Sequence, residues 1–161
     1  MKENDYHLAQ VNIGRILAPM DDPLMQEFAN NLEPINALAD SAPGFVWRLQ
    51  TEAGDATSIL AFDDTSLLIN MSVWEDVASL KAFTYQSAHV AFVRRRKEWF
   101  TRFEGIYMVL WWIPAGHIPT VAEAKERLAY LEQHGESAVA FTFQRPFAPK
   151  TSEVFETSEV L

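Results

Sequence analysis

Histidines are the residues of this chain best suited to proton transfer, because cysteine is absent and an imidazole changes charge near neutral pH. His89 falls in a helical pattern and shares a helix face with Phe92, Val93, Arg96 and Phe100. Beside a cavity it would act as a general base, whereas in a packed interior it would bond a nearby backbone group. His117 lies in a Pro-Ala-Gly-His loop, a place that favours either function or a shaped turn. Both histidines are candidate site residues, and both keep a structural alternative.

Metal, thiol and phosphate chemistry are not indicated by the sequence. Without cysteine there is no disulfide framework, no thiolate zinc site and no thiol nucleophile. The four histidines are widely spaced and form neither HxxxH nor HExxH, and glycine-rich phosphate loops and the GxSxG elbow are absent. Glu75 and Asp76 are adjacent at a strand-to-helix junction, where acids suit a helix start better than paired acid–base work. We expect no metal and no cofactor.

Composition and charge narrow the class of protein further. The chain has 161 residues, is 48% hydrophobic and carries a formal net charge of −9, which predicts one globular domain with a sizeable core. An acidic chain repels phosphate backbones, and its dense basic run, Arg94 to Lys97, fits a solvated helix face. No apolar run is long enough to cross a bilayer. We therefore expect a cytoplasmic protein that binds neither nucleic acid nor membrane.

The first half of the chain predicts a strand, a helix and a second strand. From Leu8 to Leu17, apolar and polar residues alternate with the period of two that is typical of a half-buried strand. Asp22 and Pro23 predict a helix start, and apolar residues then recur at helical spacing. Pro34 threatens a kink or a break in that helix. A Pro-Gly pair ends it, and Phe45 to Gln50 is expected to be extended.

The middle of the chain predicts two more strands, a long helix and a buried strand. Extended segments are expected from Ser58 to Phe62 and from Leu67 to Trp74. Helix is expected from Asp76 to Phe103, with a break near Ser87, and strand from Ile106 to Ile113.

The last helix is predicted to open on a capping box, Thr120 to Glu123, in which threonine bonds forward and glutamate back. It should end at Gln133, before a His-Gly pair, and a short strand should follow from Val139 to Phe143. We expect a folded domain over 1–146 and an acidic, flexible tail over 147–161.

This order of elements is that of the ferredoxin-like split βαβ fold, with an extra helix and strand at the C-terminus. The predicted fold class is therefore α+β with an antiparallel sheet. Alternation in the first strand should turn Ala9, Val11 and Ile13 toward the helices and leave Gln10 and Asn12 on the open face of the sheet.

The open face is expected to be covered, because the strand from Ile106 to Ile113 is apolar on both sides. A partner subunit in a homodimer would cover it and enclose a mostly apolar cavity with a few polar groups, as small-molecule sites have. The alternative is a sheet with one hydrated face. The residues expected to line the cavity are Asn12, Arg48, Asn70, Ser72, Trp74 and either Trp111 or Trp112.

Three blocks of sequence carry a resemblance to a known family. They are "INMSVWEDVASLKAF" (Ile69 to Phe83), "AHVAFVRRRKEWF" (Ala88 to Phe100) and "VLWWIPAGHIPTVAEAKERLAYLEQHG" (Val109 to Gly135). With the first strand and "AFTF" (Ala140 to Phe143), the likeness extends to about Pro146. The chain resembles the domain-of-unknown-function 3291 family of the dimeric α/β-barrel superfamily. "LWWIPAGHIPT" is quite specific, whereas "VWED…H" recurs across the superfamily.

The resemblance implies a homodimer in which two ferredoxin-like sheets lie face to face. The superfamily includes cofactor-independent monooxygenases of the antibiotic-biosynthesis type and some haem-containing members. Trp74 and His89 correspond to a recurring "W…H" pattern beside the pocket. A shared fold does not fix function, and the resemblance therefore assigns no activity to individual residues of this chain.

The leading hypothesis is a monooxygenase-like enzyme that deprotonates a small apolar or aromatic molecule in a dry cavity, so that oxygen can react without a metal. Two alternatives stay open: a binding protein without turnover, and a haem protein with His89 or His117 as axial ligand. The catalytic candidates are His89, Asn70 and Arg48. The substrate-binding candidates are Asn12, Ser72, Trp74, Trp111, Trp112 and His117.

Overall fold

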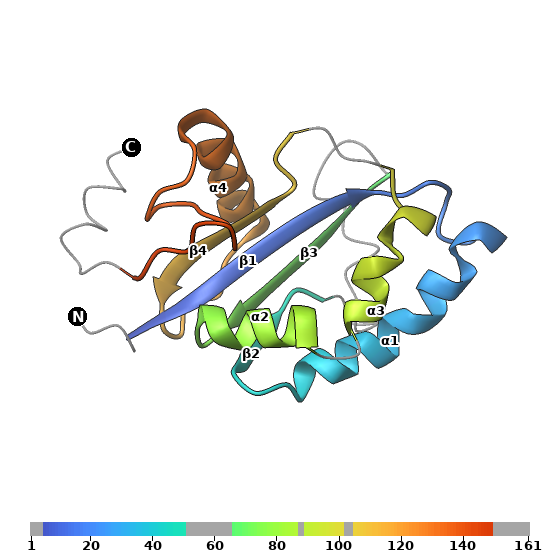
Figure 1. The fold of residues 1–161 in the computed structure, drawn as a ribbon, viewed down its shortest axis with the longest axis horizontal. Helices are drawn as coiled ribbons and strands as arrows, with labels where there is room; N and C mark the ends of the chain where they lie inside the picture. Colours follow the sequence, from blue (N-terminus) through green and yellow to red (C-terminus); the bar gives the residue numbers. More distant parts are fainter. Residues whose placement is uncertain (1–4, 51–65, 87–88, 102–104, 150–161) are drawn as a thin grey trace.

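The computed structural model describes residues 5–50, 66–86, 89–101 and 105–149, and the side chains of residues 89, 92 and 93 are outside the description. Figure 1 shows the order of the elements along the chain. They are β1 (Tyr6–Arg15), the 3-10 turn η2 (Pro23–Met25), α1 (Gln26–Asp40), β2 (Phe45–Arg48), β3 (Leu67–Trp74), α2 (Val77–Gln86), α3 (His89–Arg94), the 3-10 turn η3 (Arg96–Glu98), β4 (Met108–Pro114) and α4 (Val121–His134).

Four of these strands form one antiparallel sheet in the order β2-β3-β1-β4. The long central pair runs from Leu8 opposite Trp74 to Arg15 opposite Leu67, and β1 also pairs with β4 along most of its length. The protein is therefore an α+β protein, as the sequence predicts. β1 and β3 agree with the predicted strands to within two residues at each end.

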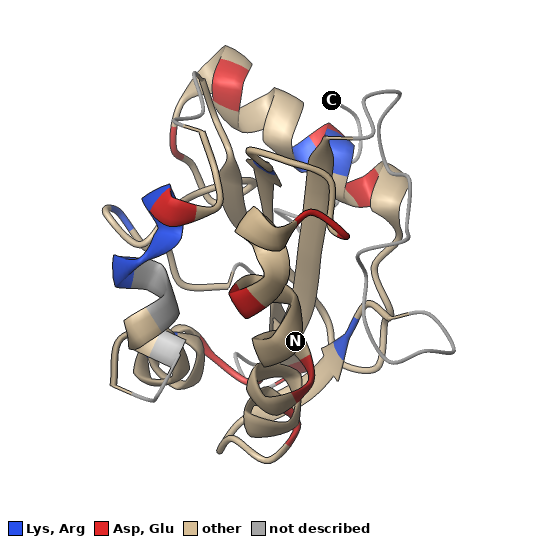
Figure 2. Cartoon of the chain, turned by 90° about the vertical axis from the view of Figure 1, so that its right-hand side faces the viewer, with Lys and Arg blue, Asp and Glu red and all other residues tan. Residues whose placement is uncertain are grey.

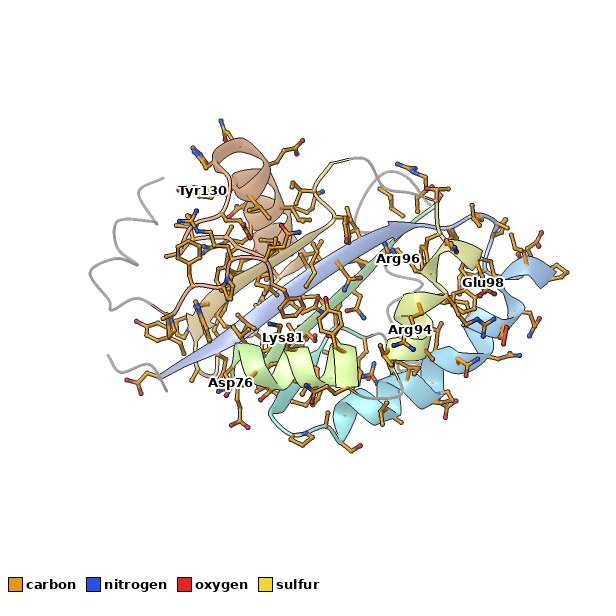
Figure 3. All side chains as sticks on the ribbon, in the orientation of Figure 1. Asp76, Lys81, Arg94, Arg96, Glu98 and Tyr130 are labelled. Atoms are coloured by element: carbon orange, nitrogen blue, oxygen red, sulfur yellow. The ribbon has the colours of Figure 1, made fainter. Side chains whose placement is uncertain are left out.

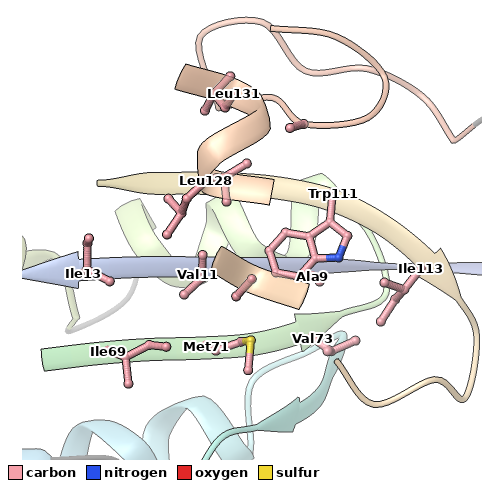
Figure 4. Close-up of a cluster of buried hydrophobic side chains, with 13 residues drawn as sticks. Ala9, Val11, Ile13, Ile69, Met71, Val73, Trp111, Ile113, Leu128 and Leu131 are labelled. Atoms are coloured by element: carbon pink, nitrogen blue, oxygen red, sulfur yellow. The ribbon is translucent and has the colours of Figure 1, made fainter. Parts of the chain in front are cut away.

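Helices cover both faces of the sheet. Leu128 and Leu131 of α4 pack with Val11 on one face, as Figure 4 shows, and Leu80 of α2 packs with Leu8 on the other. In Figure 1, α4 lies beside β4, while α1, α2 and α3 gather on the opposite side of the view. Within the described residues, no helix is long and apolar enough to span a membrane.

The assignment of the two faces is the main correction to the sequence prediction. Ala9, Val11 and Ile13 lie under α4, and Gln10 and Asn12 face the cavity that α1 and α2 help to wall. The first-strand pattern distinguishes the two faces but does not say which helices cover each one. The C-terminal helix occupies the side on which the first two helices were expected.

The helical segments differ from expectation at two points. α1 continues through Pro34, because Pro34 and Asn30 are both exposed and water can reach the carbonyl that lost its donor. The predicted helix from Asp76 to Phe103 is wrong at its end. There the chain forms η3, and then Phe100 pairs with Ile16 in an isolated bridge.

The C-terminal part also differs. The predicted strand from Val139 to Phe143 is only a single bridge, in which Leu110 and Phe141 exchange backbone hydrogen bonds of 2.7 and 2.9 Å. Phe147, the first residue of the predicted tail, accepts a hydrogen bond of 2.8 Å from Trp112 Nε1. The predicted strand from Ser58 to Phe62, the break near Ser87 and residues 150–161 lie outside the described residues.

Candidate functional site: a cavity over the polar face of the sheet

Four polar side chains lie together on β1 and β3, on the sheet face that we call the polar face: Gln10, Asn12, Asn70 and Ser72. The pairing register places Gln10 opposite Ser72 and Asn12 opposite Asn70. Gln10 and Ser72 are only 3% and 7% exposed. Buried polar side chains in the middle of a sheet must be hydrogen-bonded to be tolerated.

These side chains bond one another rather than the backbone. Gln10 Nε2 donates to Asn70 Oδ1 and to Ser72 Oγ, both at 2.8 Å, and Trp74 Nε1 donates to Ser72 Oγ at 2.8 Å. Asn12 Nδ2 donates to Gln10 Oε1 at 3.1 Å and to Asn70 Oδ1 at 3.2 Å. The network therefore fixes the orientation of each amide and of the Trp74 ring.

The network keeps hydrogen-bonding capacity for a further group. Ser72 Oγ already accepts two hydrogen bonds, so its hydroxyl proton is left to donate. Among the described residues, nothing accepts from Asn70 Nδ2 or donates to Asn12 Oδ1. Donors and an acceptor are thus available on the cavity side of the polar face.

The polar face forms the floor of a cavity of about 310 Å³. This volume is within the range of small-molecule sites. Trp74 stacks on Phe83 of α2 with ring centroids 5.2 Å apart, which holds one aromatic part of the wall in place. Apolar side chains from α1, α2 and the segment after η3 complete the wall, among them Phe28, Leu32, Ile35, Leu80, Trp99 and Phe100.

Arg48, a predicted catalytic residue, lines the cavity but already has a partner. A register shift between Phe45 and Trp47 turns Arg48 to the same face as Ser72. Its Nε and Nη2 donate to the two carboxylate oxygens of Asp40 on α1, at 2.7 and 3.3 Å. The pair ties β2 to α1 and neutralises the guanidinium, which favours a structural contribution from Arg48.

A second ion-pair cluster holds α1 against the segment after α3. Arg95 donates to Glu27 of α1 and to Glu98, with Nη1 2.8 Å from Glu27 Oε1. Hydrogen bonds from Arg95 hold the pKa of the Glu27 and Glu98 carboxyls below their ordinary value. Since Phe28 and Trp99 are neighbours of this cluster and line the cavity, it helps to position that wall.

The predicted site residues divide into two groups. Asn12, Arg48, Asn70, Ser72 and Trp74 come together at the cavity. The other candidates do not join them there, or are not described. His89 begins α3, but its side chain lies outside the described residues. The candidates that do not line the cavity are Trp111, Trp112 and His117.

The block around Trp111 and His117 forms a separate hydrogen-bonded group under the start of α4. Trp111 Nε1 donates to Glu123 Oε2 at 2.8 Å, and His117 Nε2 lies 2.7 Å from Glu123 Oε1. Thr120 Oγ1 accepts from Glu123 N at 3.1 Å, so the predicted capping box is half formed. Glu123 does not bond back to Thr120, because its carboxylate is held by the indole and the imidazole.

Sequence reasoning assigned one cavity residue to the wrong environment. The basic run from Arg94 to Lys97 is predicted to be a solvated helix face, yet Arg96 lines the cavity with Gly14 and Tyr107. The available signal was its spacing of four from Phe100, which places the two on one side of a helical turn. Among the described residues, no group of three or more acidic or histidine side chains is placed so that it could hold a metal ion.

Fold and site together define an α+β protein with a cavity between the polar face of its sheet, the helices α1 and α2, and the segment that includes η3 and Phe100. The chain belongs to the family described as Domain of unknown function (DUF3291), whose model matches residues 7–157. No curated protein matches it.

Two solved structures are similar to it. One is the crystal structure of PA3566 from Pseudomonas aeruginosa, which is 14% identical in sequence. The match covers 71% of this chain and 98% of the PA3566 chain, with a TM-score of 0.46. The other is the crystal structure of NE2512, a protein of unknown function from Nitrosomonas europaea, which is 12% identical in sequence. The match covers 73% of this chain and 98% of the NE2512 chain, with a TM-score of 0.43.

Proposed function

We propose that this protein binds a small, planar, largely apolar molecule in the cavity over the polar face. The single observation that carries the proposal is the network of Gln10, Asn12, Asn70 and Ser72 on the cavity floor. A protein that needed only a packed core would place apolar residues there, as it does on the other face of the same strands.

The cavity chemistry supports recognition of a flat ring with a polar edge. Aromatic and aliphatic side chains form much of the wall, the hydrogen-bonded network forms the floor, and a few polar residues such as Asn31, Thr84 and Arg96 lie around it. Such a division, with an apolar enclosure and a few placed polar groups, is how pockets fix the orientation of small molecules. Phe83 and other aromatic rings line the wall, and Asn70 Nδ2 and the Ser72 hydroxyl offer donors.

A direct test uses 1-hydroxy-2-naphthoate, a fluorescent planar compound, as the probe in an equilibrium titration. Asn70→Ala should weaken binding about tenfold, because it removes donors from the floor and breaks two hydrogen bonds of the network. Glu75→Ala, an exposed polar residue just after β3, is the matched control and should bind as the wild type does. Equal affinity of Asn70→Ala and wild type would contradict the proposal.

Turnover by a monooxygenase-like reaction is the second candidate function. The specific observation in its favour is the aromatic enclosure, which would exclude water from a deprotonated substrate. In that reaction a CH₂ group next to an aromatic ring loses a proton and reacts with O₂; one oxygen atom becomes the carbonyl oxygen and the other leaves as water. The described residues lining the cavity include neither carboxylate nor imidazole. The base in this proposal is His89, as the sequence predicts, and its side chain lies outside the described residues.

Oxygen uptake separates the two functions. Uptake with a hydroxylated aromatic that has such a CH₂ group, lost in His89→Ala while binding of the naphthoate is retained, supports the enzyme. Binding without uptake supports the binding protein alone. Haem binding through His89 stays a prediction, which a Soret band on adding haemin would test. His117 is a poor candidate for the axial ligand because its Nε2 bonds Glu123.

We further propose that the fold is ferredoxin-like and that the protein is a homodimer. The sheet order β2-β3-β1-β4, with helices after β1 and β3, supports the first statement. For the second, α1 and α2 cover the polar face, which was expected to meet a partner, and α4 packs on the opposite, apolar face. A dimer would therefore use another surface, or the part of the apolar face that α4 leaves uncovered. Sedimentation equilibrium at micromolar concentration would measure the oligomeric state.

A further inference from the structure

Arg96 places a guanidinium group at the edge of the cavity. It is the first residue of η3, and its Cζ lies 5.0 Å from the ring centroid of Phe100 and 5.3 Å from that of Tyr107. Figure 3 shows Arg96 beside the end of β1, with Arg94 on the preceding helix α3. Two aromatic rings thus hold the flat face of the guanidinium, which leaves its N–H edge for hydrogen bonds.

The charge of Arg96 is not neutralised by any carboxylate among the described residues. Its one hydrogen bond there is a long one, 3.4 Å from Nη2 to the backbone oxygen of Ile13. Arg95 and Arg48, by contrast, each bond acidic side chains. Carboxylates are plentiful in this protein, since the chain has a net charge of −9 and Figure 2 shows acidic positions on several elements. Their number therefore does not explain why none of the described ones pairs with Arg96.

Gly14 keeps this arrangement possible. It lies on β1 two residues after Asn12, so both positions face the cavity. A Cβ at Gly14 would lie 2.7 Å from Phe100 Cδ1 and 3.3 Å from Arg96 Nη2. The missing side chain is therefore what lets the Phe100 ring and the guanidinium lie directly on the strand, next to the polar network.

We propose that the molecule bound in the cavity is an aromatic carboxylate, whose anionic group is held by Arg96 next to Asn12. A guanidinium fork matches the two oxygens of a carboxylate, and charge-assisted hydrogen bonds of this kind are about twice as strong as neutral ones. The inference rests on the proposed binding function and adds the charge and position of one ligand group.

The test compares 1-hydroxy-2-naphthoate with 1-hydroxy-2-naphthamide, which has the same ring and hydroxyl but a neutral amide. Wild-type protein should bind the carboxylate about tenfold more tightly than the amide. In Arg96→Met that ratio should fall to about one while the affinity for the amide stays within about threefold of wild type. Because the readout is a ratio within one variant, a partial loss of folded protein does not change it.

Two further variants test whether the charge and the fork shape of Arg96 itself cause the preference for the carboxylate. Arg94→Met removes a positive charge two residues away on the exposed side of α3 and should keep the wild-type ratio. Arg96→Lys keeps the charge but loses the fork and should give an intermediate ratio. If wild type binds both compounds equally, or if Arg94→Met lowers the ratio as Arg96→Met does, this inference fails and the binding function stands. If neither compound binds, the proposed function fails as well.

Discussion

The two faces of the same sheet are built from alternate residues of the same strands, yet they differ in kind. Under α4, the face bearing Val11, Met71 and Trp111 is apolar and almost fully buried. On the other face, the positions between them carry amides and a hydroxyl that bond one another beside a cavity. Stability and recognition thus depend on opposite sides of β1 and β3, so substitutions on each side should have separable effects.

The largest effect is expected from the apolar face. Leu131→Ala, on the buried side of α4, should lower the free energy of unfolding by about 2–5 kcal/mol, through lost burial and the cavity left behind. Denaturant unfolding measures the change. Under conditions where the variant is folded, its affinity for the naphthoate should equal that of wild type. A weaker affinity at full folding would show that the two faces are coupled.

A smaller loss of stability, together with a loss of binding, is expected from the polar face. Ser72→Ala removes the acceptor of Trp74 Nε1, and that indole is 1% exposed, so the unsatisfied N–H should cost about 1–3 kcal/mol. The same variant should weaken naphthoate binding, unlike Leu131→Ala. Unchanged unfolding and unchanged binding would show that the network is incidental.

Gly14→Ala should act on the cavity with a modest effect on folding. The added methyl group meets the Phe100 ring, which is half-buried and can shift, so the cost should fall toward the lower end of about 1–3 kcal/mol. Displacing Phe100 and Arg96 should reduce the preference for carboxylate over amide. An unchanged preference would mean that the close approach at Gly14 does not position Arg96.

The smallest effect is expected from the Arg95 cluster. Hydrogen bonds from Arg95 hold the pKa of Glu27 below its ordinary 4.5 in the folded protein, so this pair stabilises the fold above that pH. Its contribution should fall away as the pH drops below about 4.5 and through the lowered pKa. Thermal unfolding of wild type and Glu27→Gln should therefore differ slightly at neutral pH and converge in acid. A difference that grows in acid would reverse the assigned sign.

The sequence predicts β1, β3 and β4 well because their signal is local. The alternation along β1 and the apolar run in β4 each appear within a few consecutive residues, and Thr120 and Gly135 mark the two ends of α4 through cap chemistry. Four of the predicted site residues reach the cavity for the same reason: Asn12, Asn70, Ser72 and Trp74. Alternation puts Asn12 on one face, and the register brings Asn70 opposite it.

What the sequence does not reveal depends on tertiary contacts. Which helix covers which face depends on where α4 docks, and periodicity carries no information about docking. The bulge in β2 turns Arg48 toward Asp40, and the basic run divides between Arg95 on the surface and Arg96 at the cavity. Glu123 leaves its expected capping bond because Trp111 and His117 reach it from β4 and the following loop.

The most direct test of the account is a titration of isotope-labelled protein with 1-hydroxy-2-naphthoate, followed through the indole N–H signals by NMR. Trp74 donates its N–H to the polar network, whereas Trp111 donates to Glu123 on the opposite face. We predict that the Trp74 signal shifts with saturation while the Trp111 signal stays in place. A shift of Trp111 with Trp74 unmoved would contradict the account.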